Sequence, residues 1–178
     1  VLDQLSLPEM SSEQEDYVHC HTVPQSLQYI VPDHLTEKAN RAAANISYEQ
    51  LIPYIQLQEG IINFLQALKK IGLGCAVNTN RSHTMKLILE NFGMESYFSP
   101  VVTSLDVQKS KPDPESIYYI LNFWNARNSE VVFIGDSWVD EHTAVSAGVE
   151  FWAYQNPELL GASMNITDYN QIAEQLGV

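Results

Sequence analysis

The ten residues from Val131 to Asp140 constrain the fold of this chain more than any other stretch. Four consecutive apolar residues are followed by Gly135, and a short apolar run ended by a glycine predicts a fully buried parallel strand. Asp136 follows this strand directly, and Asp140 lies one helical turn later if a helix begins near Trp138. Because open α/β sheets bind ligands at the carboxyl ends of their strands, we expect both carboxylates to face one crevice.

The spacing of the two carboxylates suits a hard cation. Mg²⁺ takes one or two carboxylates and keeps several waters, so Asp136 and Asp140 together predict a magnesium site. A structural alternative explains the same residues: Asp136 caps the helix and Asp140 is solvated in its first turn. This stretch alone leaves both interpretations open.

The composition favours one globular core with a small accessory module. The chain has 178 residues, of which 45% are hydrophobic and 17% charged, enough for one substantial core. Nine Lys and Arg against 22 Asp and Glu give a net charge of −13, which argues against a nucleic acid or an anionic membrane as partner. The only cysteines are Cys20 and Cys75, and no apolar run approaches the roughly 18 residues of a membrane span. We therefore expect a cytoplasmic protein.

The chain divides into a helical N-terminal module and an α/β core. Residues 1–55 show helical spacing of apolar residues, interrupted by prolines, and no convincing buried strand. From about residue 56, strand-like runs alternate with amphipathic helices. Strands are expected at 73–77, 100–104, 131–135 and 151–154, and the end of the chain is expected to be helical. This alternation predicts an α/β fold, with a Rossmann-like, mostly parallel sheet flanked by helices and a small α-helical cap at the N-terminal side.

Polar residues suited to phosphate chemistry follow three of the expected strands. Thr79 and Asn80 follow the first, Lys111 comes after the second, and Asp136 with Asp140 follow the third. A hydroxyl and free amides at a helix start bind phosphate oxygens, a lysine neutralises charge, and carboxylates hold Mg²⁺. The set fits phosphoryl transfer, in which catalysis is mainly positioning and electrostatic stabilisation.

In this order and spacing the motifs resemble those of the haloacid dehalogenase-like hydrolase superfamily, in its phosphoglycolate phosphatase-like branch with a helical cap. The resemblance covers residues from about 56 to 178. Three segments carry it: Asn78-Thr79-Asn80-Arg81 is similar to the family's strand ending in Thr or Ser and Asn, Lys111-Pro112-Asp113-Pro114 to its lysine motif, and Gly135-Asp136-Ser137 through Asp140 to its acidic motif. It implies a cap over residues 1–55 and a hydrolase core over 56–178.

The resemblance also implies a role for each motif residue. Thr79 and Asn80 would hold the transferring phosphoryl group, and Lys111 would steady both that group and the nucleophile. Asp136 and Asp140 would organise Mg²⁺, so that Thr79, Lys111 and Asp136 form the catalytic set. The Lys111 ammonium is expected about 3 to 6 Å from the Asp136 carboxylate, on a loop held extended by its prolines.

The implied activity is Mg²⁺-dependent hydrolysis of a phosphate monoester through an aspartyl-phosphate intermediate. The expected substrate is a small phosphorylated metabolite, and the expected state is a monomer or homodimer. Alternatives are a non-catalytic binding or scaffold protein of the same fold and a sugar-phosphate mutase of the same superfamily. A receiver domain phosphorylated on aspartate fits poorly, because its acidic residues belong on early strands and it has no helical module of this size. In the cap, His19, His21, Arg41 and Tyr48 are candidates for substrate selection only by their chemistry.

One element of the family pattern is absent from the sequence. The family's nucleophile and general acid are two aspartates, one residue apart, at the end of a strand that precedes the cap. The 178 residues contain no Asp-x-Asp element, and Asp3 is not assigned to this role because no apolar strand precedes it. Since Val1-Leu2-Asp3-Gln4 resembles the residues that follow the nucleophile, we expect that residue upstream of Val1.

The absent strand predicts a feature of the sheet. In the family it lies between the strands that end here at Thr79 and Gly135, so these two strands should not pair with each other. We expect a separation of about 9 to 10 Å, twice the usual strand spacing, or another segment between them. Unpaired backbone groups cost on the order of 1 to 3 kcal/mol each, so residues 1–178 alone are expected not to be stable.

Overall fold

The structure is a computed structural model that describes residues 1–177; Val178, the last residue of the expected core, lies outside the described residues. The chain forms two compact units, Val1–Pro53 and Tyr54–Val178. The boundary between the units lies close to residue 55, and the roles of cap and hydrolase core for residues 1–55 and 56–178 stay predictions.

The first unit is helical throughout its ordered elements. Its helices are α1 (Ser12–Cys20), α2 (Val23–Ile30) and α3 (Thr36–Ala44), with 3-10 turns at Asp3–Leu5, Asp33–Leu35 and Tyr48–Gln50. A further 3-10 turn, Ile52–Tyr54, includes the boundary between the two units. Ser11 and Thr22 begin the first two helices with reciprocal capping bonds to the residue three positions later, which satisfies helix-end amides. Leu27, Val31 and Ala39 form its small buried core.

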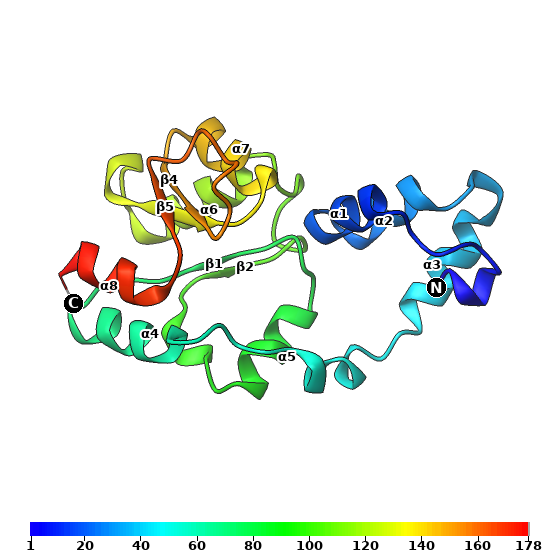
Figure 1. The fold of residues 1–178 in the computed structure, drawn as a ribbon, viewed down its shortest axis with the longest axis horizontal. Helices are drawn as coiled ribbons and strands as arrows, with labels where there is room; N and C mark the ends of the chain where they lie inside the picture. Colours follow the sequence, from blue (N-terminus) through cyan, green and yellow to red (C-terminus); the bar gives the residue numbers. More distant parts are fainter. Residues whose placement is uncertain (178) are drawn as a thin grey trace. The chain divides into compact units, whose positions relative to one another are not determined.

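The second unit alternates helices and strands, as the sequence predicts. Its elements are α4 (Ile61–Lys70), β1 (Val77–Asn78), α5 (Thr84–Asn91), β2 (Val101–Val102), α6 (Glu115–Trp124), β3 (Val132–Gly135), α7 (Trp138–Ala147), β4 (Glu150–Tyr154), β5 (Met164–Ile166) and α8 (Tyr169–Leu176). Short 3-10 turns lie at Glu95–Tyr97 and Asn128–Glu130. The architecture is α/β, with parallel strands flanked by helices (Figure 1).

The strands form two parallel sheets. In one, β1 pairs with β2, with Val77 opposite Val101. The other has the order β3, β4, β5, with Gly135 opposite Ala153. In the part of the chain that the structure describes, β1 and β3 do not pair with each other, which confirms the expected break between the strands ending at Thr79 and Gly135. The width of that separation stays a prediction.

Helices connect the two sheets through a shared core layer. Phe64 and Leu68 of α4 pack with Trp152 of β4 and Ile172 of α8, and α4 and α8 run beside each other (Figure 1). The same cluster includes Cys75, just before β1, and, on β3, Ile134. In the described residues, the two sheets are therefore connected by side-chain packing and not by backbone hydrogen bonds between their strands.

The second core layer lies on α6 and α7. Buried residues of these helices pack on the aromatic side chains of the larger sheet, including Phe133 and Phe151, whose rings meet edge to face with centroids 6.2 Å apart. Small residues of α7, Ala144 and Ala147, are nearly inaccessible to solvent, so the helix lies close to the sheet. This packing holds the first turn of α7 against the end of β3.

Three sequence expectations about strands need correction. The third strand is not fully buried, because Val132 is 37% exposed and the other residues of β3 are half-buried; among the described residues it pairs on one side only, with β4. The strand expected at 73–77 is limited to the two residues of β1. The strand at 151–154 is not the last, since β5 follows it; its three residues include Asn165 and are too few to show an alternating pattern.

No helix among residues 1–177 combines the length and the apolar character that a membrane span requires. Within residues 1–177, Cys20 and Cys75 are not joined by a disulfide.

Candidate active site

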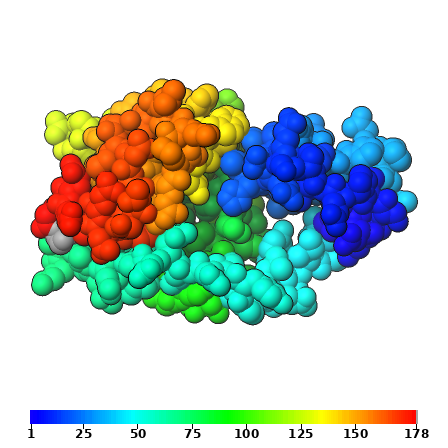
Figure 2. Space-filling view, in the orientation of Figure 1, coloured from blue at the N-terminus to red at the C-terminus, as the bar shows by residue number. Residues whose placement is uncertain are grey.

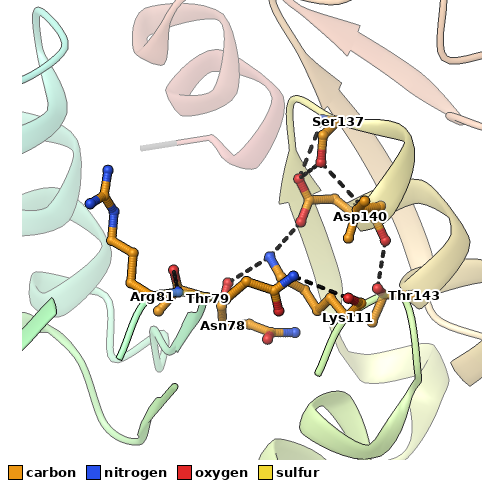
Figure 3. A network of polar contacts seen from close by, with 9 residues as sticks. Asn78, Thr79, Arg81, Lys111, Ser137, Asp140 and Thr143 are labelled. Carbon is orange, nitrogen blue, oxygen red and sulfur yellow. Dashed lines mark hydrogen bonds and ion pairs between the residues drawn. The ribbon is translucent and has the colours of Figure 1, made fainter. Parts of the chain in front are cut away.

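Lys111 lies at the centre of the candidate site. Its residue is only 8% exposed, and its Nζ donates to the carbonyl oxygen of Asn78 at 3.0 Å and to Oδ1 of Asp140 at 2.6 Å (Figure 3). The ammonium also lies 5.5 Å from the centre of the Phe133 ring, within cation–π range. One buried side chain thus links the end of β1 to the first turn of α7.

Asp140 is held on its other side by Ser137. The second carboxylate oxygen, Oδ2, accepts from Ser137 Oγ at 2.6 Å and from Ser137 N at 3.3 Å, while Ser137 Oγ accepts from the Asp140 amide at 3.3 Å. Ser137 is therefore the N-cap of α7, in a capping box. The structural alternative raised by the sequence is wrong on both counts, because Asp136 is not the cap and Asp140 is buried, with 6% of its surface exposed.

Gly135 lets the Asp140 side chain approach the end of β3. A Cβ atom added at this glycine would lie 2.7 Å from Cγ and 2.8 Å from Oδ2 of Asp140. Contacts of that length do not occur between real side chains, so any other residue would displace the carboxylate. The acidic motif therefore has a glycine at position 135 because the Asp140 side chain occupies the volume that a side chain there would fill.

Thr79 and Asn80 shape the neighbouring turn. The amide of Thr79 donates to Val102 O at 3.0 Å, and its Oγ1 accepts from the Arg81 amide at 3.1 Å. No acceptor within residues 1–177 takes the hydroxyl proton of Thr79, which is therefore available to an anion. The Asn80 side chain donates to the carbonyl oxygen of Lys111 at 3.0 Å, so Asn80 fixes the backbone of the residue whose ammonium returns to Asn78.

Asp136 differs from Asp140 in being solvent-exposed. Across residues 1–177 the structure gives its carboxylate no hydrogen bond or ion pair, whereas its backbone carbonyl accepts from Asn156 Nδ2 at 2.8 Å. The carboxylate that contacts Lys111 is that of Asp140, and the expected distance of 3 to 6 Å between Lys111 and Asp136 stays a prediction. The loop is also not extended as expected, because a turn closes it, with the Asp113 amide donating to Ser110 O at 3.1 Å.

The two carboxylates fit Mg²⁺ in different ways. No hydrogen bond or ion pair within residues 1–177 occupies the Asp136 carboxylate, which is exposed and available to a cation, whereas both oxygens of Asp140 are already bound by Lys111 and Ser137. The described residues form no cluster of three or more His, Cys, Asp or Glu around a common point, but Mg²⁺ needs only one or two carboxylates and retains water. Within residues 1–177 the two buried polar atoms of the half-buried Asn78 side chain have no hydrogen-bond partner, so the fold does not use them.

Sequence reasoning assigned no role to Ser137, although it belongs to the acidic motif, and did not identify Asn156. Ser137 could have been found, because a Ser followed three residues later by an acidic residue is a capping pattern. Asn156 carries no such signal, since it lies in the irregular segment after β4 and reaches Asp136 only in the folded chain.

The cap candidates lie in the first unit. The ring of His21 stacks on that of Tyr17 with centroids 3.7 Å apart, and Tyr17 stacks on Tyr29 at 4.1 Å. Arg41 forms an ion pair with Glu37 on the surface of α3. Roles for His19, His21, Arg41 and Tyr48 in substrate selection stay predictions.

Comparison with known proteins identifies the family. The profile of the haloacid dehalogenase-like hydrolases matches residues 1–154. This chain belongs to the haloacid dehalogenase-like hydrolase family. A solved relative agrees: a HAD-superfamily hydrolase, subfamily IA, variant 1, from Geobacter sulfurreducens is 32% identical, with a TM-score of 0.82 over 98% of this chain and 86% of that one.

Curated relatives of this haloacid dehalogenase-like chain are phosphatases and pyrophosphatases. It is 31% identical over 108 residues to a phosphoglycolate phosphatase of Rhodobacter capsulatus, covering 60% of this chain and 48% of that protein. It is 32% identical over 97 residues to the putative pyrophosphatase PpaX of Caldanaerobacter subterraneus, covering 54% and 44%. The chain thus spans about half the length of the curated relatives it matches. A predicted phosphoglycolate phosphatase from Haemophilus somnus, 20% identical with a TM-score of 0.84 over 98% of this chain and 86% of that one, shows the same fold.

Proposed function

We propose that the intact protein is a Mg²⁺-dependent phosphate monoester hydrolase that works through an aspartyl-phosphate intermediate. The observation that carries this proposal is the buried Lys111 ammonium between Asn78 O and Asp140. A cation fixed among carbonyl and carboxylate oxygens at the end of a strand is already oriented before an anionic substrate arrives. Preorganised charge of this kind supplies much of the stabilisation in phosphoryl transfer.

Different residues of this chain would bind different parts of the phosphoryl group and its Mg²⁺ ion. The Thr79 hydroxyl and the amides at the start of α5 would donate to its oxygens, and Lys111 would neutralise charge on the group and on the nucleophile. Asp136 would hold Mg²⁺, with Asp140 keeping Lys111 in place. When bound, Mg²⁺ supplies charge neutralisation for phosphate oxygens.

The nucleophile of the proposed reaction is an aspartate outside residues 1–178. Its carboxylate oxygen attacks phosphorus, the bond from phosphorus to the ester oxygen breaks, and the leaving alkoxide takes a proton from a general acid. Water then attacks the phosphorus of the acyl phosphate and loses a proton to the same group acting as base. The bond from phosphorus to the carboxylate breaks, so inorganic phosphate leaves and the aspartate is regenerated.

The proposed substrate is a small phosphorylated metabolite in the cytoplasm, hydrolysed by a monomer or homodimer. Support comes from the phosphoglycolate phosphatase and pyrophosphatase names of the curated relatives, and from the net charge of −13, which disfavours polyanionic partners. The helical first unit would select among such substrates.

A non-catalytic binding protein of the same fold is the second candidate. The observation that favours it is that Lys111 is already paired with Asn78 O and Asp140, a structural role that requires no turnover. Such a protein would keep the Lys111 and Asp136 pocket for an anion and Mg²⁺ but would not turn substrate over.

Hydrolysis of p-nitrophenyl phosphate by the intact protein, with N-terminal sequencing of the same sample, separates the two candidates. A phosphatase should show an upstream Asp-x-Asp and turnover that stops when Mg²⁺ is chelated. Lys111→Met should lower kcat at least about 100-fold, in the range found when one preorganised electrostatic contact is removed. Lys109→Met is the matched control, because that lysine is 75% exposed in its side chain and pairs with Asp113. No turnover with Mg²⁺ present would favour the binding protein.

A further inference from the structure

The segment of residues 156–161, which follows β4, is hydrogen-bonded to the turn that contains Asp136. Asn156 Nδ2 donates to the carbonyl oxygen of Asp136 at 2.8 Å, while Asn156 Oδ1 accepts from the Glu158 amide at 3.2 Å. The second contact fixes which end of the amide faces Asp136. The segment lies on the surface and is orange in Figure 2.

The other end of the segment is fastened to α7. The Gly161 amide donates to the carboxylate of Glu141, and a Cβ at Gly161 would lie 2.7 Å from Glu141 Oε1. Between the two attachments, Leu159 is buried in the core beside α6 and α7. The segment is therefore held at Asn156, Leu159 and Gly161. These contacts restrict the position from which Asn156 donates to Asp136.

Asp136 has few other restraints. Its residue is exposed, and among residues 1–177 the one side-chain hydrogen bond that the structure gives it is the bond from Asn156 to its carbonyl oxygen. The capping bonds of the same turn all involve Ser137 and Asp140. A proposed metal ligand thus depends on a side chain from another loop for the orientation of its backbone.

We propose that Asn156 is a positioning residue for Mg²⁺ binding, which acts by holding the Asp136 backbone so that its carboxylate points into the site. This inference rests on the proposed function, because it takes Asp136 as the metal ligand. Residues that orient metal ligands typically change metal affinity 10- to 100-fold when mutated. An aspartate at 156 would not serve, since an ionised carboxylate only accepts and would leave the Asp136 carbonyl without a donor.

The test is a calorimetric titration of Mg²⁺ into the intact protein without substrate. Asn156→Ala should raise the Kd for Mg²⁺ about 10- to 100-fold. Two control variants are matched to it. Asn170→Ala removes an exposed asparagine of α8, and Gly161→Ala disturbs the far attachment of the same segment without changing charge; both should bind Mg²⁺ as the wild type does.

Urea denaturation of each variant separates positioning from a general loss of stability. A lower free energy of unfolding in both Asn156→Ala and Gly161→Ala, with weaker Mg²⁺ binding only in the former, supports the inference. Equal weakening in both, or an unchanged Kd in Asn156→Ala, overturns it while leaving the proposed function standing. A wild-type protein that binds no Mg²⁺ would instead overturn the metal dependence of the proposed function, and the role of Asn156 with it.

Discussion

The Lys111 ammonium lies 2.6 Å from the Asp140 carboxylate, and about nine tenths of each side chain is buried. Together with the bond from Lys111 to Asn78 O, this ion pair connects the ends of two sheets that share no backbone hydrogen bond in residues 1–177. Surface ion pairs contribute about 0 to 1 kcal/mol, whereas removing one partner of a buried pair costs about 3 to 5 kcal/mol. The pair is therefore structurally important whether or not the site is catalytic.

Replacing Lys111 with methionine should destabilise the second unit, because Asp140 would be left buried without its cation. We expect the free energy of unfolding to fall by about 3 to 5 kcal/mol in Lys111→Met and to recover in part in Lys111→Met/Asp140→Leu. Urea denaturation measures both. Lys86→Met is the control, since Lys86 pairs with Glu90 on the surface, and a loss as small as the control's would contradict the buried pair.

Gly135→Ala should displace Asp140 from the end of β3. The added Cβ would lie 2.7 Å from Asp140 Cγ, and overpacking of this kind costs about 1 to 3 kcal/mol. Gly74→Ala is the matched control, because its Cβ would meet the Trp124 ring at an ordinary 3.6 Å. If the two variants have equal melting temperatures, Asp140 does not need the space at Gly135.

The stability of the protein should fall at high pH because of Tyr169. Burial, followed by the neighbouring Tyr154, raises the pKa of Tyr169 from 10.0 to about 12, so the folded chain binds this proton more tightly than the unfolded chain. The stabilisation is complete below pH 10.0 and is lost as the pH rises towards 12. Urea midpoints measured from pH 8 upwards should fall less steeply in Tyr169→Phe. Tyr29→Phe, at an exposed ring of α2, is the control, and identical slopes in all three proteins would refute the raised pKa.

Sequence periodicity predicted most of the fold, and motif spacing placed Lys111 near Asp140, which the structure brings into contact. The amphipathic helices after residue 56 and the strand before Asp136 follow local patterns that the structure reproduces. The short strand β5 was not predicted because its three residues have no local sequence pattern and form a strand only by pairing with β4. At the site, sequence order indicated that Lys111 and the two aspartates gather, but which carboxylate Lys111 contacts depends on packing. Gly135 leaves space for the Asp140 side chain, and the residues around Asp136 have no sequence pattern that predicts which of the two carboxylates contacts Lys111.

Asp136 and Asp140 differ in their hydrogen-bond partners, and this difference can be tested directly. The decisive measurement is a calorimetric titration of Mg²⁺ into the intact wild-type protein and its Asp136→Asn and Asp140→Asn variants. In residues 1–177 the exposed Asp136 carboxylate has no hydrogen bond or ion pair, whereas Asp140 is bound by Lys111 and Ser137. We expect Asp136→Asn to weaken binding more than about 100-fold, and Asp140→Asn to weaken it by the 10- to 100-fold of a residue that acts through others. Wild-type affinity in Asp136→Asn, or a larger loss in Asp140→Asn than in Asp136→Asn, would contradict the assignment of Asp136 as the metal ligand.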